Sequence, residues 1–370
     1  MRPSRKHYGK YLVFALTVTT GLLVSMVGVA RYFTPNEYYV KRGNQLQWDS
    51  QWISLEDPYN EGDLPAGTAT SSNETYRAEL MLFHTVPVKT VDVKVVEDRE
   101  VALCGTPFGI KMFTNGVMVV GVADIQGEDG TANPGTDAGL EAGDIITALD
   151  GQPVNRNEEI AQAMEKSAGK PVKIAFLREQ ESMETTLLPV RSKVDGTYKA
   201  GLWVRDSTAG IGTLTFYDPS TQEFAGLGHG ICDTDTTELM PLRNGEIVPV
   251  TINGVVKGQK GAPGELRGYF NKDVPMGTLH ANLDQGVYGQ LNSGAVEEQK
   301  LAGDTVCVAM KQEVQAGAAQ ILTTVDGGEP QFYDAVIEKI SYHHTESSKN
   351  MVLRITDPTL LSTTGGIVQG

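Results

Sequence analysis

The chain from residue 195 onward contains almost no helical periodicity, and this constrains the fold more than any other feature. Short apolar runs recur there, separated by turn sequences such as Asp-Pro, Gly-Gly and Asn-Gly. Runs of this kind between turn-forming residues are typical of β-strands. The 41 glycines and the 7% of aromatic residues also favour short strands and many turns over long helices. We therefore predict a mainly β protein.

The length and the charge of the chain limit its organisation and its partners. At 370 residues it exceeds one average hydrophobic core, so we expect two folded domains plus tails. A net charge of −15 argues against nucleic acid as a partner and against a polybasic membrane-binding surface on the folded part. The three cysteines, Cys104, Cys232 and Cys307, lie far apart and do not indicate a disulfide framework.

The N-terminal residues read as a membrane-targeting segment. Residues 11–30 carry no charge, and four basic residues precede them. A helix of about twenty apolar residues spans a bilayer. The basic flank holds the N-terminus in the cytoplasm, so the residues after Arg31 are expected on the far side. Gly28 and Ala30 would suit a signal-peptidase cut, but the length of the run favours an uncleaved transmembrane or signal-anchor helix within residues 1–32.

The next part of the chain reads as a spacer followed by strands. Residues 34–75 are rich in Asn, Asp, Glu, Gly, Pro and Ser with little periodicity, so we predict a linker over 33–80. From residue 76 to residue 101 the pattern changes to apolar–polar alternation, the period of a half-buried strand. This alternation predicts a strand-rich lead-in to the domain that follows.

The segment 81–192 contains a recognisable motif. Ala138-Gly139-Leu140-x-x-Gly143-Asp144-Ile145-Ile146 is followed by a turn at Asp150-Gly151 and by a helix over 158–167, with Asn155 or Asn157 as its cap. This order resembles a PDZ domain of the bacterial protease-associated type. The resemblance implies that a peptide adds as a strand to an exposed sheet edge and that backbone N–H groups capture its carboxylate.

The position of the peptide-capturing loop follows from that resemblance. It places the loop at Pro107-Phe108-Gly109-Ile110 and the receiving strand at 110–113. Phe108, Gly109 and Ile110 are thus predicted peptide-binding residues, for a peptide C-terminus or for part of the chain itself. The alternative is that Phe108 and Ile110 are core residues of a strand.

The clearest candidate for chemistry is the stretch from Phe224 to Asp233, in which Gly228 and Gly230 flank His229. Glycines so close leave room for a backbone or a substrate to approach the imidazole, as a general base requires. A histidine base also needs a carboxylate and a nucleophile. Asp233 is better suited to capping the turn after the histidine, whereas Asp357 follows a strand and precedes a proline, where a simple Asp-Pro turn is the alternative.

Cys232 offers a second chemistry, as a thiol nucleophile or as half of a metal-binding pair with the histidine. No second pair at ligand spacing accompanies it. We therefore predict neither a metal site nor a cofactor.

Several motifs in one order resemble the SpoIVB (stage IV sporulation protein B) serine peptidase family. They follow the membrane segment and the PDZ-like segment, and they are Gly-Leu-Gly-His-Gly-Ile-x-Asp, Gly277-Thr-Leu-His-Ala-Asn-x-x-x-Gly-Val-Tyr-Gly289, Ile355-Thr-Asp-Pro358 and Gly365-Gly-Ile-Val-Gln-Gly370. The resemblance implies that His229 is the general base and that Asp357 orients it. The order His, Asp, Ser further implies a chymotrypsin-like β-barrel peptidase domain over 193–370.

The sequence departs from the family at its end. The family's run continues into Met-Ser-Gly-Ser-Pro, whose first serine is the nucleophile, and this chain stops at Gly370. We therefore expect the nucleophile just beyond Gly370 and regard the peptidase domain as C-terminally incomplete. By likeness to chymotrypsin-like enzymes, the N–H of Gly370 would help to form the oxyanion hole. Ser293, beside Gly294, is a weak substitute nucleophile, and His280 is a weak competing base.

The resemblance implies a membrane-targeted serine endopeptidase of sporulation signalling. Its expected setting is extracytoplasmic, in the forespore intermembrane space, anchored in or secreted across the membrane. Its expected substrate is a membrane-bound regulator of a second protease, whose release activates a late sigma factor. The alternative is a catalytically inactive PDZ-containing scaffold that binds peptides.

Overall fold

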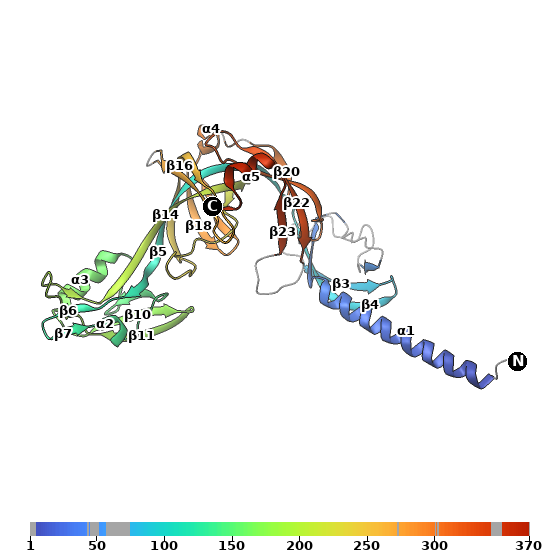
Figure 1. The fold of residues 1–370 in the computed structure, drawn as a ribbon, viewed down its shortest axis with the longest axis horizontal. Helices are drawn as coiled ribbons and strands as arrows, with labels where there is room; N and C mark the ends of the chain where they lie inside the picture. The colour runs from blue at the N-terminus through green and yellow to red at the C-terminus, as the bar shows by residue number, and fades with distance from the viewer. Residues whose placement is uncertain are drawn as a thin grey trace. The chain divides into compact units, whose positions relative to one another are not determined.

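The computed structural model describes residues 5–42, 44, 52–56, 75–271, 274–299, 301, 303–341 and 350–369 (Figure 1). The fold is mainly β, with 53% strand and 15% helix, as the sequence predicts. The chain forms two compact units, the first comprising Met1–Glu100, Val306–Gln320 and Asp334–Thr356, the second comprising the remaining segments. The predicted domain over 193–370 is thus interrupted twice, because two of its segments pack with the N-terminal unit.

The described helices and strands have the following bounds. The helices are α1 (Arg5–Phe33), α2 (Pro134–Asp137), α3 (Asn157–Ser167), α4 (Ala295–Glu298) and α5 (Pro358–Thr364). The strands up to the PDZ-like segment's end are β1 (Glu37–Lys41), β2 (Ile53–Glu56), β3 (Thr75–Leu82), β4 (Val86–Val96), β5 (Glu100–Val122), β6 (Ile125–Gly127), β7 (Gly130–Ala132), β8 (Ile145–Leu149), β9 (Gln152–Pro153), β10 (Val172–Arg178), β11 (Glu181–Leu187) and β12 (Val190–Arg191). The later strands are β13 (Tyr198–Lys199), β14 (Leu202–Tyr217), β15 (Glu223–Gly226), β16 (Leu242–Val256), β17 (Gly264–Phe270), β18 (Gly277–Leu283), β19 (Gly286–Leu291), β20 (Thr305–Cys307), β21 (Gly317–Thr323), β22 (Gln331–Ile340), β23 (Met351–Ile355) and β24 (Val368–Gln369).

The first unit contains an apolar helix and a four-stranded sheet. Within α1, Val13–Phe33 is long and apolar enough to cross a membrane, with a mean hydropathy of 2.1. The sheet has the order β1-β4-β3-β2, and Tyr38, Leu80 and Val93 are completely buried in its core. The predicted linker over 33–80 is therefore wrong where it covers β1, β2 and most of β3. A short run such as that around Tyr38 and Val40 is too weak a pattern to predict a strand by itself. It forms a strand here because it pairs with β4 and buries its apolar side chains in the core that β3 and β4 share.

Six strands of the second unit close into a barrel. The pairing runs β5-β14-β15-β19-β18-β16 and returns to β5, because β16 also pairs with β5. Alternate side chains of these strands fill the interior, where Phe108 and Phe224 meet edge to face at 6.2 Å between ring centroids. Closure leaves no free sheet edge around the ring. The structure thus has the β-barrel that the family resemblance implies, but one of its strands, β5, comes from the segment 81–192 and not from 193–370.

Two barrel strands continue into a second hydrophobic core. The C-terminal half of β5 pairs with β8 and with Leu202–Arg205 of β14, and α3 packs over the same core, which includes Ile160 and Met164. Leu202 and Val204 pack against that core. The predicted boundary at residue 192 therefore lies too early, because this small domain takes its last strand from residues that the sequence assigns to the barrel.

Candidate functional site

His229 lies in the loop that follows β15, one of the barrel strands. Leu227 and Gly228 both have positive φ, 71° and 90°, so the chain turns sharply before the histidine. The imidazole is exposed, and its Nδ1 lies 2.9 Å from the carbonyl oxygen of Gly230. If Nδ1 donates its proton to that carbonyl, Nε2 carries the lone pair that a general base needs.

The two glycines beside the histidine serve different purposes. Gly228 needs its positive φ, and a Cβ there would meet nothing within 4 Å. At Gly230 an added Cβ would lie 2.8 Å from the carbonyl oxygen of Leu283 and would also collide with Cδ1 of Leu239. The space for a substrate that the sequence predicts beside the imidazole is therefore on the Gly228 side. Gly230 lacks a side chain for another reason, because Leu239 and the backbone of Leu283 pack directly against it.

Asn282 holds the histidine loop in place, a role that its position in the sequence does not predict. Its buried side chain accepts a hydrogen bond from the N–H of Ile231 at 2.8 Å. Its amide group donates to the carbonyl oxygens of Ile231 and Met240, at 2.9 Å each. The Gly277–Gly289 motif thus holds the Gly-His-Gly motif in place. The signal available in the sequence is an asparagine between Ala281 and Leu283 inside the Gly277–Gly289 motif.

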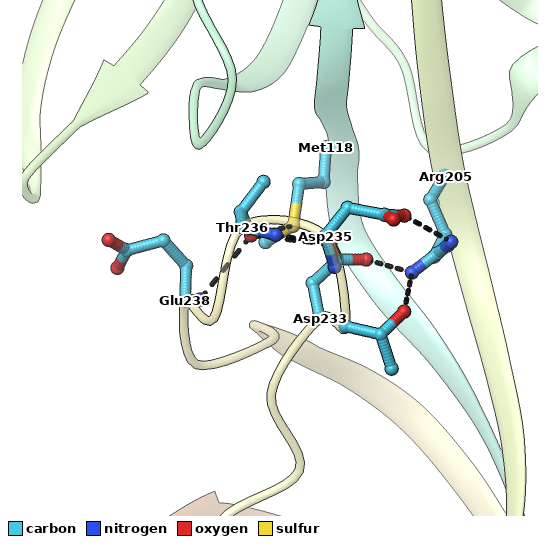
Figure 2. A network of polar contacts seen from close by, with 7 residues as sticks. Met118, Arg205, Asp233, Asp235, Thr236 and Glu238 are labelled. Atoms are coloured by element: carbon cyan, nitrogen blue, oxygen red, sulfur yellow. Dashed lines mark hydrogen bonds and ion pairs between the residues drawn. The ribbon is translucent and has the colours of Figure 1, made fainter.

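Asp233 caps the turn after the histidine, as the sequence predicts. Its Oδ1 accepts hydrogen bonds from the N–H groups of Asp235 and Thr236, at 2.9 and 3.0 Å. Its Oδ2 forms an ion pair with Arg205, whose other terminal nitrogen contacts Asp235 at 2.8 Å (Figure 2). The Asp233 side chain is completely buried, so the guanidinium is the charge that compensates a carboxylate removed from water.

Asp357 begins α5. Its Oδ1 accepts a hydrogen bond from the N–H of Leu360 at 2.9 Å, which makes it the N-cap. Burial raises the pKa of the neighbouring Tyr333, and the charges of Asp326 and Asp357 raise it further. Within the described residues, Asp357 and His229 are not hydrogen-bonded to each other. Their pairing stays a prediction.

Three further candidates from the sequence are Gly370, Ser293 and His280. Gly370, the predicted oxyanion residue, lies outside the described residues. Ser293 is in the turn before α4, as a turn serine would be. His280 is exposed on β18, with Nε2 at 3.4 Å from the hydroxyl of Thr278.

Cys232 is exposed and is a poor nucleophile. Although the residue is exposed, its sulfur is partly covered, and this desolvation raises the pKa of the thiol, which the nearby carboxylates of Asp284 and Glu238 raise further. Because the thiolate is the reactive form, this environment disfavours thiol catalysis at neutral pH. Among the described residues there is no group of three or more His, Cys, Asp and Glu side chains that could hold a metal ion.

The predicted peptide-binding residues lie in the barrel, and the structure contradicts that assignment. Phe108, Gly109 and Ile110 are part of β5, which pairs with β14 on one side and with β16 on the other. The side chains of Phe108 and Ile110 are buried in the barrel core. A strand paired on both sides has no edge to offer a peptide, so the alternative interpretation, that these are core residues, is correct.

A groove lies elsewhere, between α3 and the start of β14. It encloses a cavity of about 530 Å³, lined mainly by apolar groups, among them Ile160, Ala161, Met164, Leu202, Trp203 and Val204. The N–H of Ala123 donates to the carbonyl of Gly201, and Leu202 is opposite Val122 in the register. By the alternation of antiparallel pairs, the N–H and C=O of Leu202 point away from β5, towards the other edge of the strand.

That edge is open in the part of the chain that the structure describes. No described strand pairs with Leu202–Val204 on the side away from β5. Just before it, the N–H groups of Ala200 and Gly201 have no described acceptor, although both residues are buried. The groove thus combines an unpaired strand edge, free backbone donors and an apolar cavity.

Two known protein families match the regions that contain the histidine loop and the groove. A model of the family described as SpoIVB peptidase S55 matches residues 196–370, and a model of the PDZ domain matches residues 131–178. The chain belongs to the SpoIVB peptidase family. The matched peptidase region includes the barrel strands from β14 onward and the histidine loop, and the PDZ match includes α3.

One solved structure with similarity is the PDZ domain of an SdrC-like protein from Listeria monocytogenes. It is 25% identical over 24% of this chain and 87% of that chain, with a TM-score of 0.21. In the SpoIVB-family chain the groove is shared between the two matched regions. Its helix lies within the PDZ match, and its strand lies within the peptidase match.

Proposed function

We propose that this protein is a serine endopeptidase in which His229 is the general base, Asp357 orients it, and a serine that follows Gly370 in the gene is the nucleophile. The SpoIVB peptidase S55 match over 196–370 carries the proposal. The exposed imidazole, held by its backbone in a loop beside the barrel, supports the role of His229. In this mechanism the base takes the proton of the serine hydroxyl and later gives it to the leaving amine.

Asp357 has one oxygen available for that role. Its Oδ1 caps α5, which leaves Oδ2 to accept a hydrogen bond from Nδ1 of His229 in place of the carbonyl of Gly230. The N–H of Gly370 is the proposed oxyanion donor, aimed at the carbonyl oxygen as it becomes negative.

The catalytic proposal is tested with a chain extended through the codons that follow Gly370. With a peptide substrate, we expect His229→Ala to lower kcat by about 10⁴-fold or more, and Asp357→Asn by a similar order. His280→Ala is the matched control and should leave kcat unchanged. Equal cleavage by His229→Ala and the unmodified enzyme would overturn the proposal.

The biological setting is also a proposal. Family membership supports a role in sporulation, and the candidate membrane helix with its basic flank supports extracytoplasmic domains. We propose that the enzyme acts in the forespore intermembrane space on a membrane-bound regulator of a second protease, and thereby promotes activation of a late sigma factor. Cleavage of candidate regulators in co-expressing cells, compared between the unmodified and His229→Ala enzymes, tests this.

We propose that the groove beside α3 binds the carboxyl end of a protein ligand. A peptide added to the edge of Leu202–Val204 would pair with the outward backbone groups of Leu202. Its carboxylate would accept hydrogen bonds from the N–H groups of Ala200 and Gly201, and an apolar last side chain would enter the cavity lined by Ile160 and Met164.

Trp203 reports on this binding because it lines the groove and is 67% exposed. A hexapeptide ending in three valines should change the tryptophan fluorescence when its carboxylate is free, and much less when it is an amide. Equal responses to the two peptides would contradict the proposal. Peptide binding by an extended chain that cleaves nothing would favour the scaffold function instead.

A further inference from the structure

Adjacent residues of β14 connect the groove to the histidine loop. Leu202–Val204 line the groove, Arg205 follows directly, and Asp206 comes next. Arg205 contacts Asp233 and Asp235 in the loop after His229. Asp206 accepts a hydrogen bond at 2.9 Å from the N–H of Asn157, the first residue of α3. One strand therefore holds the helix wall of the groove and the loop of the proposed base.

On the C-terminal side of the histidine, the Arg205 contacts are one side-chain attachment of the loop, and the hydrogen bonds of Asn282 are another. The ring of His229 contacts the carbonyl of its neighbour Gly230, so its position follows the backbone of its loop. That backbone is fixed before the histidine by β15, and after it by Asn282 and by the buried Asp233. Because Asp233 is completely buried, loss of its cation would leave an uncompensated charge and would displace the loop.

A second contact joins the same loop to β5. The hydroxyl of Thr236 lies 3.8 Å from the sulfur of Met118, which is opposite Arg205 in the register of β5 and β14 (Figure 2). Met118 is completely buried and is also opposite Ile145 of β8. The loop thus rests on the two strands that pass from the barrel into the PDZ domain.

We propose that Arg205 is a positioning residue for His229 and that it couples the loop of the base to the state of the PDZ groove. A peptide that enters between α3 and β14 acts on both walls of the groove, and both walls are attached to residues 205 and 206. The resulting displacement of β14 moves the guanidinium, and with it Asp233 and Asp235. The naming of His229 as the base rests on the proposed function, whereas the coupling of groove to loop does not.

The test uses Cys232 as a reporter that needs no catalysis. Cys232 is exposed, lies three residues after His229, and with Cys307→Ser becomes the one exposed thiol, because Cys104 is buried. Cys232 is exposed but its sulfur is partly covered, and displacement of the loop would remove that cover, so Arg205→Ala should accelerate alkylation of this thiol by about tenfold. Arg205→Lys should restore part of the protection. Arg77→Ala, which removes an arginine from an exposed ion pair in the other unit, is the control.

The coupling is tested by filling the groove. Ala161 is exposed and lines the cavity, so Ala161→Trp wedges α3 away from β14, while Gln162→Trp places the same side chain on a neighbouring exposed position that does not line it. Ala161→Trp should accelerate alkylation of Cys232 when Arg205 is present and should add nothing in Arg205→Ala. Continued protection of Cys104 shows in each variant that the fold is intact.

Three results would overturn the proposal. They are an unchanged Cys232 rate in Arg205→Ala, an effect of Ala161→Trp that is the same with and without Arg205, and an equal effect of Gln162→Trp. In the extended enzyme, Arg205→Ala should lower kcat with little change in KM, and Arg205→Lys should recover part of it. Cleavage that survives His229→Ala would refute the proposed base and leave the Cys232 result standing.

Discussion

Individual polar side chains hold the histidine loop at fixed distances from the barrel. Asn282 spans two backbone segments with three hydrogen bonds, and Asp233 closes the following turn against Arg205. The side chains of Asn282 and Asp233 are buried, and a buried polar side chain is tolerated only when its polar atoms are hydrogen-bonded. The rigidity of the proposed base therefore depends on residues that do no chemistry.

Replacement of Asn282 by alanine should destabilise the second unit by about 2 kcal/mol, because it leaves the part-buried N–H of Ile231 and the buried carbonyl of Met240 without their hydrogen-bond partner. Urea unfolding followed by circular dichroism measures this. Asn292→Ala is the matched control, since Asn292 is exposed and its side chain makes one hydrogen bond, to Pro275. Equal stability of the two variants would show that the Asn282 contacts are dispensable.

The three thiols should separate by reactivity. Burial raises the pKa of Cys104 to about 12, so its thiolate fraction at pH 8 is about one in ten thousand, and its sulfur is also shielded. Two thiols should therefore react with a maleimide in the folded protein, and the third only after unfolding in urea. Mass spectrometry of the labelled chain counts them. Rapid labelling of Cys104 without urea would contradict the burial.

At the scale of elements, β5 and β14 are the strands on which the second unit depends. Each is long enough to belong to the barrel at one end and to the PDZ core at the other. Helix α3 is attached to them at its N-terminus through Asp206 and through Asn155, whose side chain accepts a hydrogen bond from the N–H of Gly116. The hydrogen bonds at the start of α3 therefore hold the helix wall of the groove in place.

Glu159 should make the stability of the PDZ domain depend on acid pH. The N–H groups of Asn155 and Arg156 donate to its carboxylate, at 2.7 and 3.0 Å, and they lower its pKa below the usual 4.5. A carboxyl group whose pKa is lower in the folded state stabilises fully above its unfolded pKa, and that stabilisation is lost as the pH falls through the folded value. Glu159→Gln should lower the urea midpoint at pH 7 and flatten its decline between pH 5 and pH 3.

Glu158→Gln is the control for that measurement, because Glu158 is exposed in the same first turn. Its replacement should leave the decline below pH 5 in place. If the profile of Glu159→Gln declines below pH 5 as steeply as that of the unmodified protein, the lowered pKa of Glu159 is not the cause.

At the scale of the whole molecule, the chain forms two units that are each built from distant parts of the sequence, and the apolar helix belongs to the first of them. Segments after residue 305 return to the N-terminal unit, and the PDZ core takes a strand from the peptidase region. Cutting the chain at residue 192 would therefore divide a hydrophobic core. Fragments for biochemical work should keep residues 101–205 together.

The apolar helix should anchor the chain in a membrane. We expect the full chain to remain in the membrane fraction after extraction with alkaline carbonate. A variant with Leu16→Arg and Leu22→Arg should be released, because each arginine near the centre of a membrane helix costs about 2.5 to 3.5 kcal/mol on insertion. Glu37→Arg, outside the helix, should leave retention unchanged. Release of the unmodified chain would contradict anchoring.

The sequence by itself determined the features that depend on local pattern. Apolar runs between turn residues gave the mainly β fold, twenty uncharged residues gave the N-terminal helix, and the Gly-Leu-Gly-His-Gly and Ala-Gly-Leu motifs gave the family. The turn-capping role of Asp233 was also visible, because an aspartate binds backbone groups within a few residues of itself.

Only the tertiary structure decided which distant strands share an edge. The groove lies beside Leu202–Val204 and not beside Ile110, where the PDZ resemblance placed the receiving strand, because β5 continues into the barrel and is paired there on both sides. The roles of Asn282 and Arg205 were hidden for the same reason, since their partners lie 51 and 28 residues away. Strand pairing and buried hydrogen bonds depend on closeness in space, which the order of residues along a chain does not specify.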